Sequence, residues 1–196
     1  SSKTEICLCK ERSYRCFHKK IKSFLARQPL SWKVAVHDES IFIYDVKIRK
    51  VWAVKGSKPI ILSTGSHKLL VMSGAIFEER SQFFRSYPVA DSDSFLAFLK
   101  ALLNKHPKTI LFIDRAPWHK EKRVKHFIKH NKHRLKIQWF PSGHPEVNPM
   151  EETWNQGKEI VLGSHYYSTF AEFRKAVLLF YRTKRFKLDL YKYLCP

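Results

Sequence analysis

The sequence lacks any apolar run long enough to cross a membrane. Its longest apolar stretches, residues 109–113 and 176–180, are far shorter than the roughly 20 residues that a spanning helix needs. The N-terminal region also lacks the apolar segment of a secretory signal peptide. We therefore expect a soluble, intracellular chain with no membrane-embedded part.

Acidic side chains are also scarce. The chain carries 17 Asp and Glu against 37 Lys and Arg, which gives a formal net charge of +20. A positive excess of this size favours a polyanionic partner, either nucleic acid or an anionic membrane surface, over a charge that serves solubility alone. Apolar residues make up 44% of the chain, so the charge belongs to a protein with a core and not to a disordered basic tail.

The four cysteines do not form the pattern of a disulfide framework. Cys7, Cys9 and Cys16 cluster near the start and are followed by His18, while Cys195 is the penultimate residue. The cluster offers zinc ligands in principle, but it lacks the paired spacing of C-x-x-C sites. Reduced thiols are therefore the favoured interpretation.

Internal repeats and low-complexity linkers are absent as well, which indicates one folded domain. Residues 1–31 differ from the rest because they are basic and carry a weak helical stripe of Phe17, Ile21 and Phe24 that ends before a proline. We predict a basic lead-in arm or linker at 1–31 and the folded domain at 32–196.

The hydrophobic pattern predicts an antiparallel start followed by β-α-β units. Helices are expected after the N-cap candidate Asp91 and at about 120–132, 149–162 and 168–184. The predicted strands are 33–37, 41–44, 50–54, 69–77, 109–113 and 135–140. This order is that of the ribonuclease H-like fold, an α/β architecture in which helices flank a five-stranded mixed sheet.

Two carboxylates are predicted to close neighbouring strands. Asp38 follows strand 33–37, and Asp114 follows strand 109–113, whose continuous apolar composition indicates burial on both faces. Right-handed crossovers would make these strands parallel neighbours about 4.8 Å apart, with both carboxylates at the edge where α/β sites form. Each Asp alone is weak evidence, because an Asp that closes a strand is more often a turn or cap residue.

A third carboxylate lies at the start of a predicted helix. Asn148 is a good N-cap, so Glu151 falls in the first turn and could be the return partner of a capping box. Helical spacing places Trp154 and Lys158 on the same face as Glu151 and turns Glu152 away by a quarter circle. A helix face with a carboxylate, an indole and an ammonium suits a surface that meets metal and phosphate. The pattern therefore favours Glu151 over Glu152 as the third carboxylate.

Four segments in register resemble the DDE/D transposases of the mariner superfamily, especially their bacterial and archaeal insertion-sequence branch. The family patterns read roughly DES, RxWAxxGxxP, DNAxxH and PxLNPIExxWxxxK. The matching segments are HDES at 37–40, RKVWAVKG at 49–56 with Pro59, IDRAPWH at 113–119, and PEVNPMEETW at 145–154 with Lys158. The resemblance covers about residues 30–162. Arg115 replaces the usual Asn and Met150 the usual Ile, but neither change removes a carboxylate.

The resemblance implies the catalytic domain of a cut-and-paste DNA transposase, with Asp38, Asp114 and Glu151 as the metal-binding triad. Two Mg²⁺ ions, for which Mn²⁺ may substitute, would lie about 3.5–4 Å apart, with Asp38 bridging them. Water would cut the transposon end, and the freed 3′-hydroxyl would attack a TA dinucleotide in target DNA. The partners would be DNA and a second copy of the chain, and the location would be the bacterial or archaeal cytoplasm or nucleoid.

Further residues are expected to contact DNA. The basic helix at 120–132 would bury Val124, Phe127 and Ile128 on one face and follow phosphates with the other. His119 either touches the scissile phosphate or is structural, and segment 181–187 would add to non-specific binding. The DNA-binding candidates are Arg115, His119, Lys120, Lys122, Arg123, Trp154 and Lys158.

Two other functions remain open. A ribonuclease H-like nuclease would share the fold and the metals but would not join strands. A non-enzymatic, domesticated DNA-binding protein would use the basic surface and hold no metal. Relatives carry N-terminal helix-turn-helix modules for which the chain has no room, so we expect a catalytic-domain fragment or one reading frame of a split element.

Overall fold

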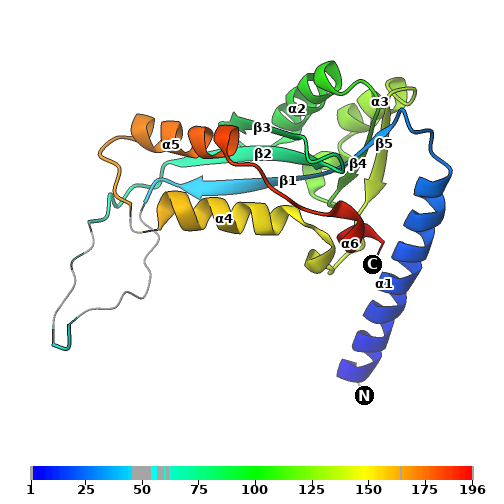
Figure 1. The fold of residues 1–196 in the computed structure, drawn as a ribbon, viewed down its shortest axis with the longest axis horizontal. Helices are drawn as coiled ribbons and strands as arrows, with labels where there is room; N and C mark the ends of the chain where they lie inside the picture. The colour runs from blue at the N-terminus through cyan, green and yellow to red at the C-terminus, as the bar shows by residue number, and fades with distance from the viewer. Residues whose placement is uncertain (1, 46–53, 57–59, 61, 164, 196) are drawn as a thin grey trace.

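The computed structural model describes residues 2–45, 54–56, 60, 62–163 and 165–195, and within these it describes the side chains from residue 14 onward except that of residue 145. A five-stranded mixed sheet forms its centre, in the order β3-β2-β1-β4-β5 (Figure 1). The pairs β1/β2 and β2/β3 are antiparallel, whereas β1/β4 and β4/β5 are parallel. The strands are β1 (Lys33–Ile43), β2 (Leu69–Phe77), β3 (Gln82–Tyr87), β4 (Thr109–Ile113) and β5 (Leu135–Trp139). The predicted ribonuclease H-like architecture is confirmed.

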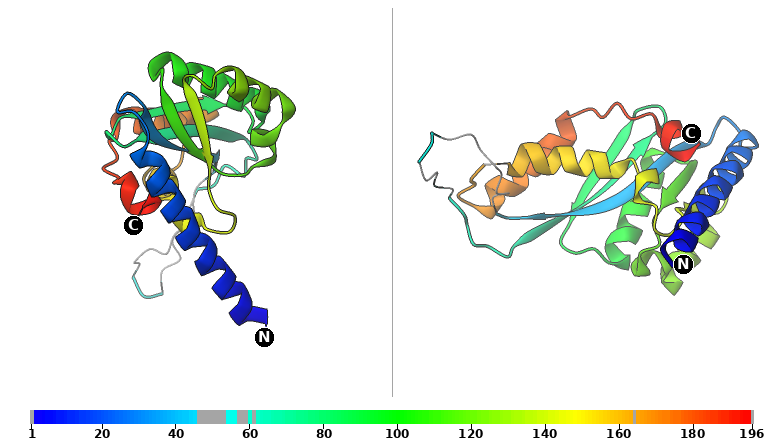
Figure 2. Two further views of the ribbon diagram at one scale, coloured as in Figure 1. Left: turned by 90° about the vertical axis from the view of Figure 1, so that its right-hand side faces the viewer. Right: turned by 90° about the horizontal axis from the view of Figure 1, so that it is seen from below.

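Helices cover both faces of this sheet (Figures 1 and 2). One face packs against α2 and α3, and the other packs against α4 and α5. The helices are α1 (Ser2–Ala26), α2 (Ser92–Lys105), α3 (Lys122–His130), α4 (Met150–Leu162), α5 (Phe170–Thr183) and α6 (Leu190–Leu194), with short 3-10 turns η1 (Pro117–Lys120) and η2 (Pro145–Val147). None of the described helices is both long and apolar enough to span a membrane.

Strand β1 divides its side chains between the two layers, because successive residues of a strand point to opposite faces. Val36 and Phe42 belong to the core under α4 and α5. Ala35 belongs to the core under α2, where the neighbouring His37 stacks on Phe98 at a centroid distance of 4.4 Å. This alternation directs Asp38 and Glu39 into different layers, although they are adjacent in sequence.

The structure extends β1 beyond the prediction. The expected strands 33–37 and 41–44 form one strand of 11 residues, so Asp38 lies within β1 and does not close it. The antiparallel partner β2 continues opposite residues 35–43 and holds the strand straight past Asp38. Strand β3 was not predicted, because three of its six residues are polar. The expected strand 50–54 falls largely outside the described residues.

The N-terminal arm is a helix that leads away from the body (Figure 2). Its predicted stripe is real: Ile21 is buried, and Phe17 and Phe24 pack against the α4/α5 core. The Nδ1 atom of His18 lies 2.7 Å from the Leu194 carbonyl oxygen, which ties α1 to α6. Cys16 is an exposed free thiol; the side chains of the other two clustered cysteines lie outside the described residues.

Close packing of α4 on α5 requires a residue without a side chain at position 157. A Cβ atom at Gly157 would lie 1.9 Å from the Tyr181 hydroxyl oxygen. That hydroxyl donates to the Thr153 carbonyl oxygen at 3.3 Å. The glycine therefore lets α5 approach the helix whose first turn carries Glu151.

Candidate active site

The two predicted aspartates come together on neighbouring parallel strands. Register pairs Val36 of β1 with Phe112 of β4, and two residues farther along the same register Asp114 stands beside Asp38. Both line a cavity of about 400 Å³, and Glu151 from the first turn of α4 lines it as well. The predicted meeting of the parallel strands is thus confirmed, and the three carboxylates share one cavity.

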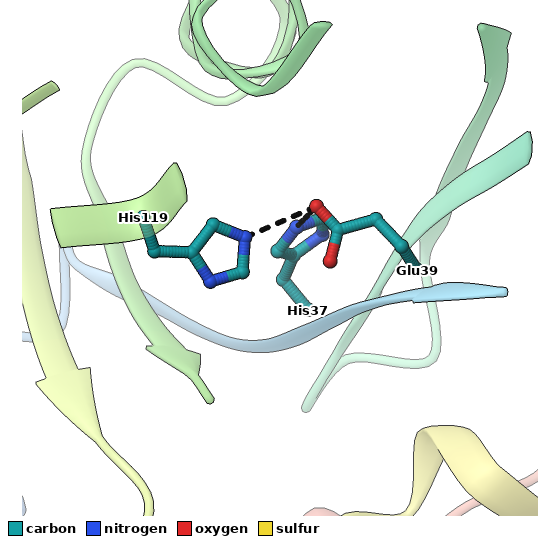
Figure 3. Close-up of side chains that lie close together, drawn as sticks. All are labelled: His37, Glu39 and His119. Carbon is teal, nitrogen blue, oxygen red and sulfur yellow. Dashed lines mark hydrogen bonds and ion pairs between the residues drawn. The ribbon is translucent and has the colours of Figure 1, made fainter. Parts of the chain in front are cut away.

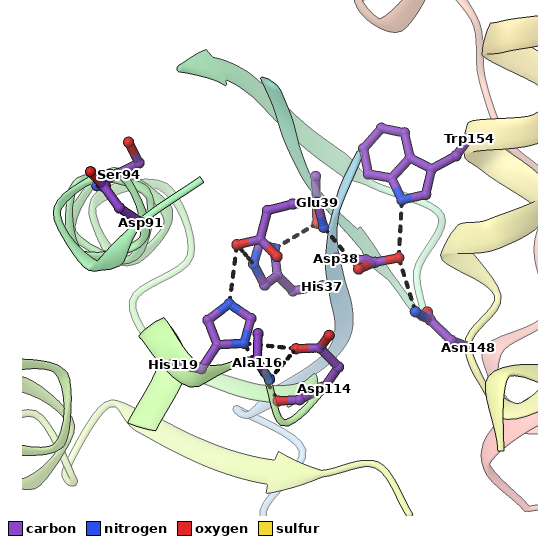
Figure 4. Close-up of polar contacts among 11 residues, drawn as sticks. His37, Asp38, Glu39, Asp91, Ser94, Asp114, Ala116, His119, Asn148 and Trp154 are labelled. Atoms are coloured by element: carbon purple, nitrogen blue, oxygen red, sulfur yellow. Dashed lines mark hydrogen bonds and ion pairs between the residues drawn. The ribbon is translucent and has the colours of Figure 1, made fainter. Parts of the chain in front are cut away.

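Asp38 is held by three hydrogen bonds (Figure 4). Its Oδ2 atom accepts from the Asn148 side-chain amide and from the Trp154 indole N–H, each at 3.1 Å. Its Oδ1 atom accepts from the Glu39 backbone N–H at 2.9 Å. Burial, reinforced by the negative charges of Glu39 and Asp114, nevertheless raises the pKa of Asp38 to about 6. Three hydrogen bonds from neutral donors therefore fix the carboxylate in place, but they do not balance its negative charge.

Asp114 has a different environment. One of its oxygens, Oδ1, accepts from the His119 Nδ1–H at 2.8 Å and from the Ala116 backbone N–H at 3.0 Å. Burial raises the pKa of Asp114, but these hydrogen bonds outweigh it and hold the pKa below its usual value. No residue in the described ranges donates to Oδ2, and the side chain is 49% exposed. One oxygen of Asp114 is therefore oriented and the other is free to bind a ligand.

His119 is in turn held by Glu39 from the opposite side (Figure 3). Its Nε2 atom lies 3.1 Å from Glu39 Oε1, and the Nε2 atom of His37 lies 3.3 Å from the same oxygen. The Nδ1–H of His37 donates to the Gly74 carbonyl oxygen at 2.8 Å. The side chains of both histidines are fully buried and that of Glu39 is 10% exposed, so the three form a closed polar cluster under the cavity.

A proton on His119 balances negative charge in this cluster. Burial lowers the pKa of His119, but the hydrogen bonds to Asp114 and Glu39 outweigh it and raise the pKa to about 9. Burial raises the pKa of Glu39, but the charge of His37 and the hydrogen bond from His119 hold it well below the usual value. His119 therefore donates from both ring nitrogens to ionised carboxylates. The ligand atoms of His37, Glu39 and His119 lie within 4.8 Å of one another, a spacing that also suits a cation.

Glu151 lies in the first turn of α4, and its carboxylate accepts no hydrogen bond from any described residue. Asn148 stands just before the helix, and its side-chain oxygen accepts from the Met150 backbone N–H at 3.1 Å. The N-cap position falls on Pro149, which makes no side-chain cap hydrogen bond, so the alternative of a capping box is not formed. Glu152 accepts from the Tyr193 hydroxyl at 3.0 Å and from the Gln156 side chain, and it does not line the cavity.

The residues of the cavity fit a divalent cation. Three carboxylates converge there, and two of them have oxygens that no described side chain satisfies. Burial, with the charges of Glu39 and Asp114, raises the pKa of Asp38. Mg²⁺ prefers such oxygen ligands and keeps part of its own water shell, so a few carboxylates suffice. The three carboxylates do not all approach within 4.8 Å of one another.

The candidate DNA contacts separate into three groups. Arg115, Lys120 and Lys122 are exposed, and Arg115 lines the cavity while its Nε–H donates to the Phe140 carbonyl oxygen at 3.1 Å. Arg123 is engaged in ion pairs with Glu121 and Asp93. The other three residues do not line the cavity. His119 and Trp154 are buried against the catalytic candidates, and the Lys158 ammonium lies 5.7 Å from the Phe42 ring centroid.

A family model described as DDE superfamily endonuclease matches residues 33–174, a span that includes all three carboxylates. The chain belongs to this family. No curated protein matches the chain significantly.

Solved structures show which fold this DDE domain shares. The Mos1 transposase in a paired-end complex with the left transposon end has 15% identity and a TM-score of 0.65 over 94% of this chain. The Mos1 strand transfer complex has 13% identity and a TM-score of 0.68 over 92% of this chain, and a Mos1 mariner paired-end complex with Mn has 14% and 0.63 over 93%. The chain spans 58%, 56% and 56% of the lengths of these proteins, respectively. At this identity the likeness concerns the fold.

Sequence reasoning missed the polar cluster of this DDE domain. Glu39 was noticed only as part of the segment HDES, and His37 was assigned to a strand. The signal that could have revealed them is alternation: in a strand buried on both faces, the neighbours of an active-site Asp point into the opposite layer. A buried Glu there needs a partner, and His119, five residues after Asp114, is the histidine of the motif that carries the second carboxylate.

Proposed function

We propose that this chain is the catalytic domain of a DNA transposase that cuts transposon ends and joins the freed 3′-hydroxyl to target DNA with Mg²⁺ or Mn²⁺. The observation that carries the proposal is the convergence of Asp38, Asp114 and Glu151 on one cavity, where Asp38 is short of positive charge. Membership of the DDE endonuclease family and the fold shared with a strand transfer complex support it.

We assign the three carboxylates to the metal ions. Two divalent ions held there would supply charge neutralisation at the scissile phosphate and activation of the attacking oxygen. Trp154 and Asn148 orient Asp38 by donating to its Oδ2 atom. His119 orients Asp114 by donating to Oδ1, which leaves Oδ2 toward the cavity. Arg115 on the rim is placed to meet a phosphate, since its side chain is exposed there.

The resemblance also suggests finer features. We expect a TA dinucleotide as the target, a dimer that brings two transposon ends together, and a place in the bacterial or archaeal branch of the superfamily. The exposed Lys120 and Lys122, on η1 and α3, which follow Asp114 in the chain, are expected to add phosphate contacts.

A strand-transfer assay on pre-cut transposon ends tests the proposal. Asp38→Ala, Asp114→Asn and Glu151→Gln should each lower Mg²⁺- or Mn²⁺-dependent joining by about a thousandfold or more, because each removes a ligand charge from the metal site. Glu152→Gln is the matched control: it changes a neighbouring carboxylate that faces Tyr193, and joining should persist. Cleavage without joining in the parent protein would identify a nuclease instead, and full activity of Glu151→Gln would refute the triad.

A further inference from the structure

A second cavity, of about 570 Å³, lies across the edge strand β3. Its walls come from β3, from the C-terminal end of α5 and from the last residue of α2, which flank this edge of the sheet (Figure 1). We call this cavity the edge groove and define it by its four cationic side chains, Arg85, Lys105, Arg182 and Arg185.

The charge of the edge groove is unbalanced. No carboxylate lines it, and within the described part of the chain none of its four cations forms an ion pair. Two cations elsewhere are paired: Arg123 binds Asp93 and Glu121, and Lys33 binds Glu79. Four like charges around one hollow repel one another, so the groove favours an anionic occupant.

The cations are also held in place. The Arg85 guanidinium lies 5.5 Å and the Lys105 ammonium 5.8 Å from the centroid of the Phe83 ring, although the two residues belong to different elements. Cation–π attraction thus directs both toward the same hollow. On the other side, the Arg185 side chain donates to the Arg182 carbonyl oxygen at 3.4 Å. A contact therefore orients three of the four cations of the groove, Arg85, Lys105 and Arg185.

The edge groove is connected to Asp38 of the active site through two neighbouring strands and through Trp154. Asp38 pairs with Gly74 of β2, and Gly74 pairs with Phe84 of β3, which lines the groove. The Trp154 ring, whose N–H donates to Asp38, packs edge-on against Phe84 at a centroid distance of 5.7 Å. Two strand spacings place β3 about 10 Å from Asp38. One turn of duplex DNA is about 34–36 Å long, so a duplex with a phosphate at Asp38 extends well past the groove.

We propose that the edge groove binds the sugar–phosphate backbone of the same duplex whose scissile phosphate enters the active site. The inference rests on the proposed function, which supplies that duplex. Arg and Lys contacts to phosphates provide affinity without sequence readout and release counterions, so binding here is steeply salt-dependent. The alternative is protection of the exposed β3 edge, because charged side chains on edge strands prevent pairing with other molecules.

The test compares two variants of the full chain with the same loss of charge. The groove variant carries Arg85→Gln, Lys105→Gln, Arg182→Gln and Arg185→Gln. The control variant carries Lys19→Gln, Lys20→Gln, Lys22→Gln and Arg27→Gln, which are exposed on α1 and in the turn that follows it. Binding to a duplex of roughly 30 base pairs, about three helical turns, is measured by fluorescence anisotropy at several salt concentrations in the presence of a chelator. Thermal unfolding confirms that both variants fold.

The groove variant should bind about 100-fold more weakly, and its salt slope should fall by about 3 to 4, or about 0.9 per lost phosphate contact. The control variant should lose much less of both. Equal losses in the two variants would overturn the proposal, as would wild-type binding by a groove variant that aggregates, which would identify edge protection. Binding in chelator needs no metal, so this result is independent of the strand-transfer assay that tests the proposed function.

Discussion

Asp38 and Glu39 are neighbours in sequence, but the two faces of β1 give them opposite environments. On the α4 face, Asp38 meets other carboxylates across an open cavity, and its pKa is raised to about 6. On the α2 face, Glu39 meets two buried imidazoles, and its pKa is held below the usual value. The difference lies in the source of the positive charge: the proton on His119 serves Glu39, whereas for Asp38 we propose a bound cation.

The largest effect is expected when the buried cluster of Glu39, His37 and His119 is disrupted. Glu39→Gln keeps the side-chain volume but removes the negative charge that His119 and His37 share, which should destabilise the fold by about 3–5 kcal/mol. Because His119 would no longer be fixed, strand joining should fall by about 10–100-fold. Chemical denaturation and the joining assay measure the two effects. Glu152→Gln should change neither by a comparable amount.

The pH dependence of stability tests the protonation of His119 in the same buried cluster. The pKa of His119 is raised from 6.5 to about 9, so its contribution is complete below about pH 6.5 and is lost as the pH rises through 9. Unfolding free energies measured from pH 6 to 10 should fall by about 3 kcal/mol over this window. His119→Asn should remove most of this fall; an unchanged fall in that variant would contradict the assignment of the proton to His119.

On the α4 face of β1, strand joining is expected to depend on the orientation of the Asp38 carboxylate. Trp154→Phe keeps an aromatic ring against Phe84 and Tyr181 but removes the indole donor to Asp38 Oδ2. Loss of a hydrogen bond to a charged group costs about 1.5–3 kcal/mol, so joining should fall by about tenfold or more and the pKa of Asp38 should rise further. Trp32→Phe, at a ring that stacks with Lys136, is the matched control. Equal activity of the two variants would exclude this orienting role.

The fourth prediction concerns competition between a proton and the metal at Asp38. With a pKa of about 6, Asp38 is ionised above this pH and protonated below it, so Mn²⁺ binding should be level above about pH 7. Below about pH 6 the Kd should rise about tenfold per pH unit. Calorimetric titration from pH 5 to 8 measures this dependence. A Kd that stays constant down to pH 5 would show that Asp38 does not bind the ion.

The carboxylates on the α4 face of β1 could be predicted from sequence, but the role of Glu39 on the α2 face could not. Asp38 and Asp114 follow apolar segments whose parallel pairing brings them together, and the spacing of α4 distinguishes Glu151 from Glu152. The extension of β1 past Asp38 was not expected, because its end depends on β2, a partner about 30 residues away in the chain. The role of Glu39 depends on that extension. The edge groove likewise required β3, whose polar residues concealed the strand.

Mn²⁺ binding to Asp38→Asn and to Glu39→Gln, measured side by side by calorimetry, tests the central claim most directly. If the ions bind on the open face, Asp38→Asn should abolish binding, whereas Glu39→Gln should weaken it by only about 10–100-fold through the orientation of Asp114. The opposite result, normal binding by Asp38→Asn and none by Glu39→Gln, would place the ion among His37, Glu39 and His119 and would contradict the account.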